Sequence, residues 1–177
     1  MWGSSGQLVA GTEGVIVDEA GVSLPPGETG ELLIRGPQVM RGYLNRPEAT
    51  EETIRTDGFL RTGDVAFADA DGHLFFVDRL KELIKVKGFQ VAPAELEGLL
   101  LELPEVADAA VIGVADERAG QRPKAFLVLR EGAMLTEDGC IGALRTSLAE
   151  YKLPRDVVFV EQIPKSPSGK ILRRQLS

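Results

Sequence analysis

The spacing of apolar and polar residues predicts mainly β-structure in the first part of the chain. Short apolar runs occur in "GQLVAGTEGVIVDE" and "GELLIRG", and the Gly- and Pro-rich "SLPPGETG" separates them. Runs of this length bounded by turn residues are typical of β-strands. In "GDVAFADADGHLFFVDR" two apolar runs flank Asp71-Gly72, a strong β-hairpin signal. We also expect one short helix in "NRPEATEETIRTDGF", with Pro47 near its start.

Helical periodicity over longer segments begins after residue 79. The segment "APAELEGLLLELPEV" predicts a helix that begins at Pro93 and is stopped by Pro104. A second amphipathic helix is predicted in "TEDGCIGALRTSLAEYKL", with Thr136 as its N-cap and an end before Pro154. The apolar face of the first of these helices comprises Leu96, Leu99, Leu100 and Leu103.

Apolar runs of strand length surround these two helices. "ELIKVKGFQV" alternates around Gly88 and predicts a strand pair or a bent strand. "ADAAVIGVAD", "RPKAFLVLRE" and "DVVFVE" predict three more strands. We therefore expect an α+β fold, in which a β-rich N-terminal segment precedes a small α+β C-terminal domain with a short sheet flanked by helices.

The change of pattern near Asp78 and Arg79 marks the expected domain boundary. Residues 79–177 are numerous enough to bury a core of their own. Residues 1–78 contain no helical pattern long enough to cover a sheet, so one apolar face would stay open. We therefore expect residues 1–78 to be an incomplete, β-rich part of a larger domain.

Composition and charge limit the possible functions. Of the 177 residues, 44% are hydrophobic and 27% charged, which is typical of globular proteins rather than disordered ones. The net charge of -7 argues against a general nucleic-acid binder, because phosphates would be repelled. No apolar run approaches the roughly 18 residues of a membrane helix, and "MWGSSGQLVAG" lacks the features of a signal peptide. We expect a cytoplasmic protein without a membrane span or a nucleic-acid partner.

Cysteine and histidine are too few to form a Cys/His metal cluster. The chain has one cysteine, Cys140, and one histidine, His73. Cys140 stands in a predicted helix, which favours a buried structural thiol. His73 follows the turn signal "DADG", which favours an exposed turn residue over a catalytic base. We therefore expect no metal site in this chain and no Cys–His catalysis.

Two basic clusters stand out in this acidic chain. They indicate either local anionic ligands or two solvated faces, and the charge pattern leaves both possibilities open. Their members are Arg79, Lys81, Lys85 and Lys87 near the predicted boundary, and Lys165, Lys170, Arg173 and Arg174 near the end of the chain.

The second basic cluster contains "IPKSPSGKILRR", in which residues 167–169 predict a turn. One interpretation is a turn followed by a short terminal helix that begins at Lys170. A phosphate-binding P-loop does not fit, because Pro164 stands where the first glycine is needed and Ile171 stands where Ser or Thr would hold magnesium. The role of Lys170 therefore depends on the rest of the chain.

Three long segments, taken in order, resemble a known family. They are "RTGDVAFADADGHLFFVDR", "LKELIKVKGFQVAPAELE" and "IPKSPSGKILRR". Together they are similar to the C-terminal third of the acyl-adenylate-forming (AMP-binding) superfamily, which includes acyl-CoA synthetases, 4-coumarate–CoA ligase, firefly luciferase and peptide-synthetase adenylation domains. "GELLIRGPQVMRGYLNRPEAT" extends the resemblance over essentially the whole chain, and "VKGFQVAPAELE" is closer to the CoA ligases than to the peptide synthetases.

The resemblance implies a two-step reaction. A carboxylic acid and Mg-ATP give an acyl-adenylate and pyrophosphate, and the thiol of CoA then displaces AMP to form a thioester. The implied cofactors are ATP/AMP and Mg²⁺, with CoA as co-substrate. In the first step Lys170 would bind the nucleotide and stabilise charge between the attacking carboxylate and the α-phosphate. Rotation about a hinge at Asp78 would then replace the Lys170 turn by "KVKGFQ".

The resemblance also implies roles for other residues. Asp64, expected in a loop before a strand, would accept hydrogen bonds from the two ribose hydroxyls, and Arg79 would contact the ribose region. Without the resemblance, Asp64 would be interpreted as a turn residue, and the segment around Gly88 as a charged strand edge with a bulge. The residues implied in the second step are Lys85 as a catalytic residue and Gly88, Phe89 and Gln90 as CoA contacts.

Several motifs of such an active site have no counterpart in this chain. No segment resembles the family's Thr/Ser/Gly-rich phosphate loop, its aromatic substrate pocket or the "TE" motif that helps to hold Mg²⁺. We therefore expect a C-terminal fragment of an AMP-forming carboxylic acid–CoA ligase that is inactive alone. The alternatives are a non-catalytic nucleotide- or partner-binding module and a piece of a peptide-synthetase adenylation domain.

Overall fold

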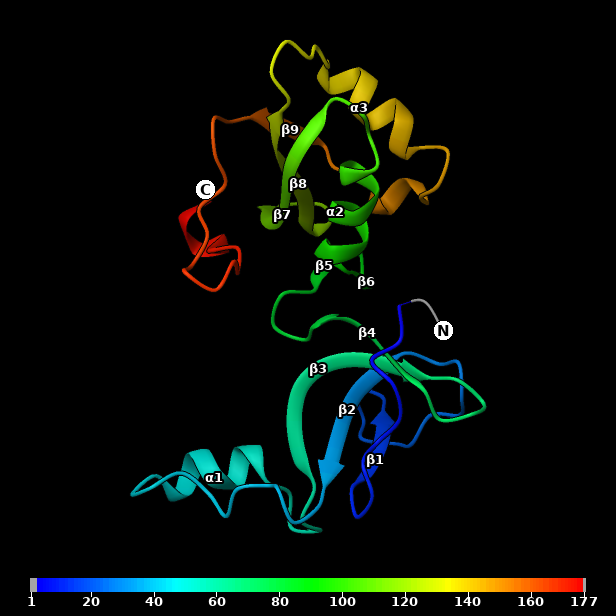
Figure 1. Ribbon diagram of the computed structural model, residues 1–177, viewed down its shortest axis with the longest axis vertical. Coiled ribbons are helices and arrows are strands. Elements are labelled where there is room, and N and C mark those ends of the chain that lie inside the picture. Colours follow the sequence, from blue (N-terminus) through cyan, green and yellow to red (C-terminus); the bar gives the residue numbers. More distant parts are fainter. Residues whose placement is uncertain (1–2, 177) are drawn as a thin grey trace. The chain divides into compact units, whose positions relative to one another are not determined.

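The computed structural model describes residues 3–176 (Figure 1). The chain divides into two compact units, of which the first runs to Lys81 and the second begins at Glu82. This division lies a few residues after Asp78 and Arg79, where the sequence pattern changes. Residues 1, 2 and 177, which belong to the ranges expected for the two domains, lie outside the described residues.

The first unit is built on a four-stranded antiparallel sheet. Helix α1 (Pro47–Thr53), between the second and third strands, has proline in its first turn, as predicted. The strands lie in chain order and are β1 (Glu13–Val17), β2 (Gly30–Arg35), β3 (Leu60–Ala68) and β4 (Leu74–Arg79). The predicted strands, short helix and β3–β4 hairpin are therefore confirmed.

The second unit contains a five-stranded sheet and two α-helices, which confirms the α+β class. Its helices are α2 (Pro93–Leu101) and α3 (Glu137–Leu144), with short 3-10 segments η1 (Glu150–Lys152) and η2 (Arg173–Gln175). Its strands are β5 (Ile84–Val86), β6 (Phe89–Val91), β7 (Val106–Asp116), β8 (Gly120–Leu129) and β9 (Asp156–Phe159). β8 pairs with β7 and β5 in antiparallel fashion and with β9 in parallel, so that β7 is an edge strand.

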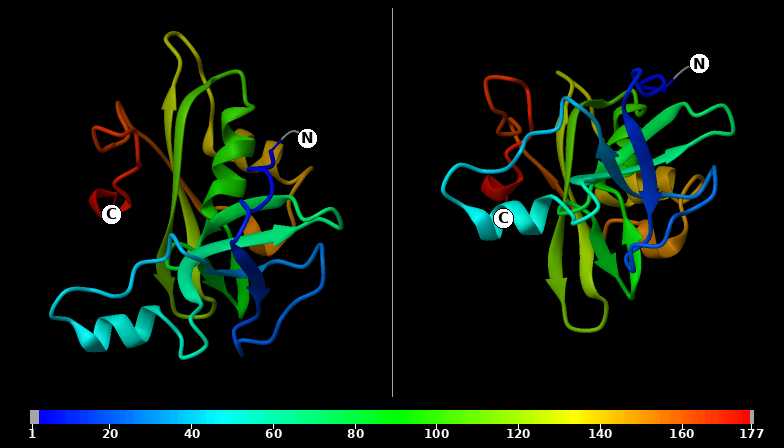
Figure 2. Two further views of the ribbon diagram at one scale, coloured as in Figure 1. Left: turned by 60° about the horizontal axis from the view of Figure 1, so that its bottom comes forward. Right: turned by 90° about the horizontal axis from the view of Figure 1, so that it is seen from below.

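Strands β7 and β8 carry apolar residues on both faces, and different parts of the chain cover them. Helices α2 and α3 cover one face, where their leucines and Cys140 share a buried cluster with Val111. The chain after β9 covers the other face, where Ile163 and Leu176 cluster with Phe126. Figure 2 shows the helices and the C-terminal segment on opposite sides of this strand pair.

Helix α2 is shorter than the sequence predicts. Leu96 and Leu100 are fully buried, as expected for its apolar face. The helix ends at Leu101, however, and does not continue to Pro104. A proline disfavours the helical conformation of the residue before it. Leu103 precedes Pro104 and therefore cannot readily continue the helix.

Helix α3 also ends early. Thr136 is its N-cap, as predicted, and its Oγ1 accepts the N–H of Gly139. The helix ends at Leu144 and not just before Pro154, because the N–H groups of Thr146 and Ser147 donate to carbonyls only three positions earlier, those of Ala143 and Leu144, and the chain tightens into turns. None of the helices between residues 3 and 176 has the length and apolar character that a membrane crossing requires.

His73 is not the exposed turn residue that the sequence predicts. Its side chain is half-buried, and Nδ1 lies 3.2 Å from Oδ2 of Asp69. The reason is the β3–β4 turn, in which Asp69 Oδ1 accepts the backbone N–H groups of Asp71 and His73. These contacts lower the pKa of Asp69, and the backbone hydrogen bond from His73 is the largest cause.

Cys140 is fully buried, as predicted. Burial raises the pKa of its thiol to about 11, and the negative charge of Glu137 adds to the shift. The thiolate is the reactive form of cysteine, so the thiol should react only when the second unit opens. Cys140 is therefore a reporter of the stability of this unit.

Two adjacent leucines on α2 test the assignment of the core. Leu100 is fully buried, whereas Leu101 is 46% exposed. We expect Leu100→Ala to lower the free energy of unfolding of the second unit by about 2–5 kcal/mol, because it leaves a cavity. Leu101→Ala should change it by less than about 0.5 kcal/mol. The measurement is the rate of Cys140 labelling by a disulfide reagent across a denaturant series, and equal acceleration in both variants would contradict the assignment.

Candidate functional site

The two residues expected to contact the nucleotide ribose face each other in the first unit. Asp64 lies on β3 and Arg79 is the last residue of β4, and the two are partners in the strand ladder. Arg79 Nη1 lies 2.8 Å from Asp64 Oδ1. Asp64 therefore belongs to a strand and not to the predicted loop, because the pairing with β4 extends through it.

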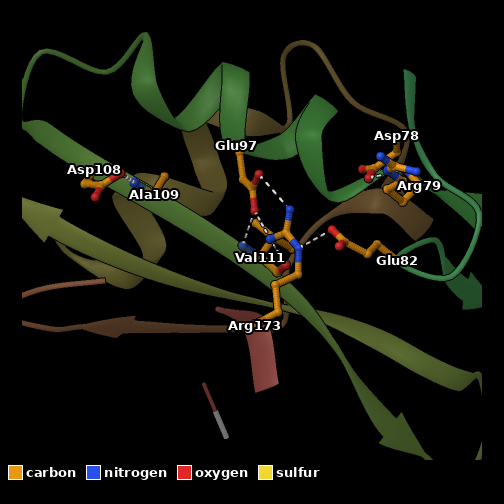
Figure 3. A network of polar contacts seen from close by, with 8 residues as sticks. All are labelled: Asp78, Arg79, Glu82, Glu97, Asp108, Ala109, Val111 and Arg173. Atoms are coloured by element: carbon orange, nitrogen blue, oxygen red, sulfur yellow. Dashed lines mark hydrogen bonds and ion pairs between the residues drawn. The ribbon is translucent and has the colours of Figure 1, made fainter. Parts of the chain in front are cut away.

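The backbone around this pair is held in an irregular but hydrogen-bonded conformation. Gly63 has a φ of 69°, in the region that favours glycine, and Thr62 Oγ1 accepts the N–H of Asp64. Asp78, the expected hinge residue, accepts the N–H of Arg79 with its own Oδ1 at 2.7 Å; both residues are drawn in Figure 3. The Asp64 carboxylate is thus presented from an ordered strand, with one oxygen engaged by Arg79.

The residues expected in the CoA step lie on the β5–β6 hairpin. Its connection is Lys87-Gly88, with φ values of 51° and 85°. Positive φ at both central residues is the pattern of a two-residue hairpin turn, for which glycine is strongly preferred. The pairing of the two strands is regular, with Lys85 opposite Gln90, so Gly88 marks a turn and not a bulge. The hairpin thus brings Lys85, Gly88, Phe89 and Gln90 together.

A hollow lies beside this hairpin in the second unit. The ring of Phe89, which is 56% exposed, stacks on Tyr151 with 4.7 Å between the ring centroids. Tyr151 also lines a hollow of about 510 Å³. The charged residues of its lining are Lys87, Arg122, Arg145, Arg155 and Glu150. Sequence reasoning missed Tyr151 and the three arginines, because they are scattered along the chain and share no motif.

Lys170 closes a tight turn and does not begin a helix. The N–H of Gly169 donates to the carbonyl of Ser166, and the N–H of Ser166 donates to the carbonyl of Lys170. Ser166 Oγ accepts the N–H of Lys170 at 3.1 Å. The last helical segment begins only at Arg173. The interpretation of a terminal helix beginning at Lys170 is therefore wrong, because its backbone groups are used to close the turn.

The segments on both sides of this turn are attached to the sheet of the second unit. Before the turn, Ile163 is buried, and Lys165 Nζ lies 2.6 Å from Oδ2 of Asp108. After it, Ile171 packs against the same apolar cluster as Ile163. The exposed Lys170 is thus carried by a turn with an attachment at each end.

Arg173, three positions after Lys170, enters a partly buried polar network (Figure 3). Its guanidinium contacts both carboxylate oxygens of Glu97 on α2 and donates to Glu82 Oε2 at 2.7 Å. It also donates to the carbonyl of Val111 at 2.9 Å, while Glu97 Oε1 accepts the N–H of Val111 at 2.8 Å. Burial opposes the charge of Arg173, but hydrogen bonds to Glu97 and then Glu82 outweigh it and raise its pKa.

This network satisfies the open edge of the sheet at Val111. β7 is an edge strand, and Val111 directs both of its backbone polar groups to the Glu97–Arg173 pair. Buried backbone groups without partners are costly, so the pair serves as a substitute for a neighbouring strand. The sequence contained one signal for this network. Glu97 is a charged residue four positions after Pro93, on the apolar face of α2. Sequence reasoning did not use this signal, and nothing local identified Arg173 as the partner.

One group of possible metal ligands occurs between residues 3 and 176. Asp69, Asp71 and His73 each offer a ligand atom, and these atoms lie within 4.8 Å of one another. The turn hydrogen bonds accepted by Asp69 account for their proximity. The group contains no cysteine and only one histidine, and it differs from the Cys/His clusters considered above.

Two family models and several curated proteins match the chain. Residues 95–170 match the AMP-binding enzyme C-terminal domain, and residues 1–44 match the AMP-binding enzyme. The 4-coumarate–CoA ligase-like 6 of Oryza sativa subsp. japonica is 55% identical over 99% of this chain and 29% of its own length. The 4-coumarate–CoA ligase 1 of Solanum tuberosum is 54% identical over 98% of this chain and 32% of its own length. The chain thus spans about a third of the length of the curated relatives it matches.

Solved structures share the fold along almost the whole chain. ATP-bound MatB from Rhodopseudomonas palustris aligns with a TM-score of 0.93 at 34% identity, over 98% of this chain and 35% of that chain. The o-succinylbenzoate CoA synthetase MenE from Bacillus subtilis, in complex with the acyl-adenylate intermediate OSB-AMP, aligns with a TM-score of 0.89 at 36% identity, over 99% of this chain and 35% of that chain. The chain therefore belongs to the AMP-binding family of acyl-adenylate-forming enzymes and corresponds to their C-terminal portion.

Proposed function

We propose that this chain is the C-terminal part of an AMP-forming carboxylic acid–CoA ligase. In the first half-reaction an oxygen of the acid would attack the α-phosphorus of ATP, and pyrophosphate would leave. In the second, the CoA thiolate would attack the acyl carbon, and AMP would leave with the electron pair on its phosphate oxygen. The observation that carries the proposal is that the second unit presents two separate lysines, Lys170 beside a tight turn and Lys85 on the β5–β6 hairpin, one suited to each half-reaction.

Lys170 is the residue proposed for adenylate formation. Its side chain is exposed, and its backbone is held by the turn between Ser166 and Gly169. An ammonium group placed in this way can enter a neighbouring site and stabilise the negative charge that develops on the α-phosphate oxygens. Because the turn is ordered in advance, little reorganisation would be needed at the moment of reaction.

Asp64 and Arg79 are proposed to bind the ribose of the nucleotide. An ionised carboxylate has about four lone-pair sites, and the ion pair with Arg79 uses Oδ1 of Asp64. The second oxygen can therefore accept hydrogen bonds from ribose hydroxyls. The Arg79 side chain is about half exposed, which leaves other guanidinium N–H groups accessible to a ligand.

The β5–β6 hairpin and the hollow beside it are proposed to serve the CoA step. Lys85, Gly88, Phe89 and Gln90 lie together on the hairpin. No other atom lies within 4 Å of the position that a Cβ would occupy at Gly88, so a ligand can approach the backbone there. CoA carries several phosphate charges, and the hollow is lined by four basic residues and a single acidic one. Phe89 and Tyr151 add an aromatic surface beside it. These features fit a phosphorylated thiol substrate.

Asp78 is proposed as the hinge about which the second unit rotates, so that the β5–β6 hairpin replaces the Lys170 turn at the active site. It is the second-last residue of β4 and lies just before the division between the two units. Hinges absorb a change of backbone angles at a few residues at the ends of elements, and the position of Asp78 fits this requirement.

The acid and Mg²⁺ are proposed to bind mainly to parts of the enzyme that this chain does not cover. The relatives extend well beyond the matched segment, and the phosphate-loop and magnesium motifs find no counterpart here. 4-Coumarate, the acid in the name of several relatives, is a suitable test substrate. The test protein is a chimera, in which this chain replaces the segment of the Solanum tuberosum 4-coumarate–CoA ligase 1 that it matches.

In this chimera, Lys170→Ala should slow acyl-adenylate formation by about 100-fold or more, because a preorganised charge at the transition state is lost. The measurement is pyrophosphate release that depends on 4-coumarate in the absence of CoA. Thioester formation from supplied acyl-adenylate serves as the internal control and should stay within about twofold of the parent. Equal loss in both half-reactions would contradict the role of Lys170.

Lys85→Ala should have the opposite selectivity. Thioester formation from supplied acyl-adenylate should slow by about tenfold or more, since the substitution removes a charge near the leaving phosphate. Adenylate formation should remain close to that of the parent chimera. Single-turnover assays of the two steps make the comparison, and a greater loss in adenylation than in the CoA step would refute the assignment.

A further inference from the structure

The Lys170 turn is ordered internally, but its own hydrogen bonds do not determine where it lies on the second unit. The backbone hydrogen bonds that close the turn join residues within 164–172, for example the N–H of Leu172 to the carbonyl of Pro164. The Lys165–Asp108 ion pair on one side is partly exposed, and such pairs hold a segment weakly. Apolar contacts of Ile163 and Ile171 attach the segment without fixing its direction. A more specific attachment is needed to place Lys170.

Arg173 provides directional contacts of this kind. Its side chain is 18% exposed and reaches four acceptor atoms on helix α2, on strand β7 and on the segment before β5. The two-oxygen contact with Glu97 fixes the plane of the guanidinium, which a single hydrogen bond would not do. The carbonyl of Val111 adds a contact to the edge strand, so rotation about the Glu97 contact is also restricted. Only three positions separate this fixed group from Lys170.

Glu82 extends the network to the beginning of the second unit. It is the first residue after the division between the units and follows the expected hinge residue Asp78 by four positions. Its Oε2 lies 2.7 Å from Arg173 Nε. The guanidinium therefore contacts both the segment that contains Glu82 and helix α2 (Figure 3). Arg173 itself follows the Lys170 turn directly along the chain, so it links that turn to both.

We propose that Arg173 is a positioning residue for Lys170, and that its contacts with Glu97 and Glu82 hold the Lys170 turn in the place required for acyl-adenylate formation. The inference rests on the proposed function of Lys170. Arg173 does not touch the reacting atoms in this scheme. Misplacement of a catalytic group by about 1 Å can cost about 100-fold in rate, so loss of the network should affect adenylation strongly. The CoA step, which uses the β5–β6 hairpin, should be spared.

The structural part of the proposal can be tested on this chain without any enzymatic activity. Arg173→Met should accelerate amide hydrogen exchange at Ser166 and Leu172, which close the turn, by about tenfold or more. Exchange in the β7–β8 ladder, for example at Leu127, should change much less. Arg130→Met is the matched control, because Arg130 is exposed and makes a single side-chain hydrogen bond to the Pro104 carbonyl. Uniform acceleration in the ladder and the turn would indicate general destabilisation and overturn the proposal.

The functional part uses the chimera described above. Arg173→Met should lower kcat for adenylate formation by about 10- to 100-fold with little change in the KM for ATP, and leave the CoA step within about twofold. Glu97→Gln should also lower kcat for adenylate formation. The double variant should have the same kcat as Arg173→Met, because both substitutions remove the same Glu97–Arg173 interaction. Arg173→Lys should retain an intermediate rate, since lysine keeps the charge but not the two-point contact.

The outcomes separate this inference from the proposed function. If Lys170→Ala abolishes adenylation but Arg173→Met leaves it within about twofold of the parent, the positioning role is overturned and the role of Lys170 stands. If Arg173→Met slows both half-reactions equally, its role is general stability and the proposal is again overturned. If Lys170→Ala itself has no effect on adenylation, both the proposed function and the positioning role fail.

Discussion

The second unit depends on the requirement that both faces of the β7–β8 strand pair be covered. Small and branched apolar residues alternate along these strands, and each face forms its own buried cluster. Helices α2 and α3 bury one face, but they do not cover the face that contains Phe126. The C-terminal segment must therefore return across that face. This return is what places Lys170 on the second unit.

The two layers meet at the edge strand β7, where a charged pair takes the place of a missing strand. Glu97 comes from the helical layer and Arg173 from the C-terminal layer, and both bind the backbone of Val111. A buried charge is tolerated only with a partner, so each residue depends on the other. A contact that closes the sheet edge therefore also attaches the lysine-bearing turn, and packing and proposed catalysis are linked through it.

Much of this arrangement was predictable from local patterns. Strand alternation, the Asp71-Gly72 hairpin and the Thr136 cap correctly indicated elements, because each depends on residues close in sequence. Predictions failed where a distant or competing contact decides. Helix α3 gives way to turns whose N–H groups bond carbonyls three positions earlier, and Asp64 joins a strand because β4 pairs with it. The partnership of Glu97 with Arg173 spans 76 positions, and only the fold brings them together.

We propose that this chain supplies the Lys170 turn for adenylate formation and the β5–β6 hairpin with Lys85 for thioester formation. Single-turnover kinetics of the chimera with the unaltered chain tests this claim most directly. We expect 4-coumarate and ATP to give an acyl-adenylate without CoA, and added CoA to convert this intermediate to the thioester. A chimera that folds and binds ATP, but forms neither product, would contradict the account.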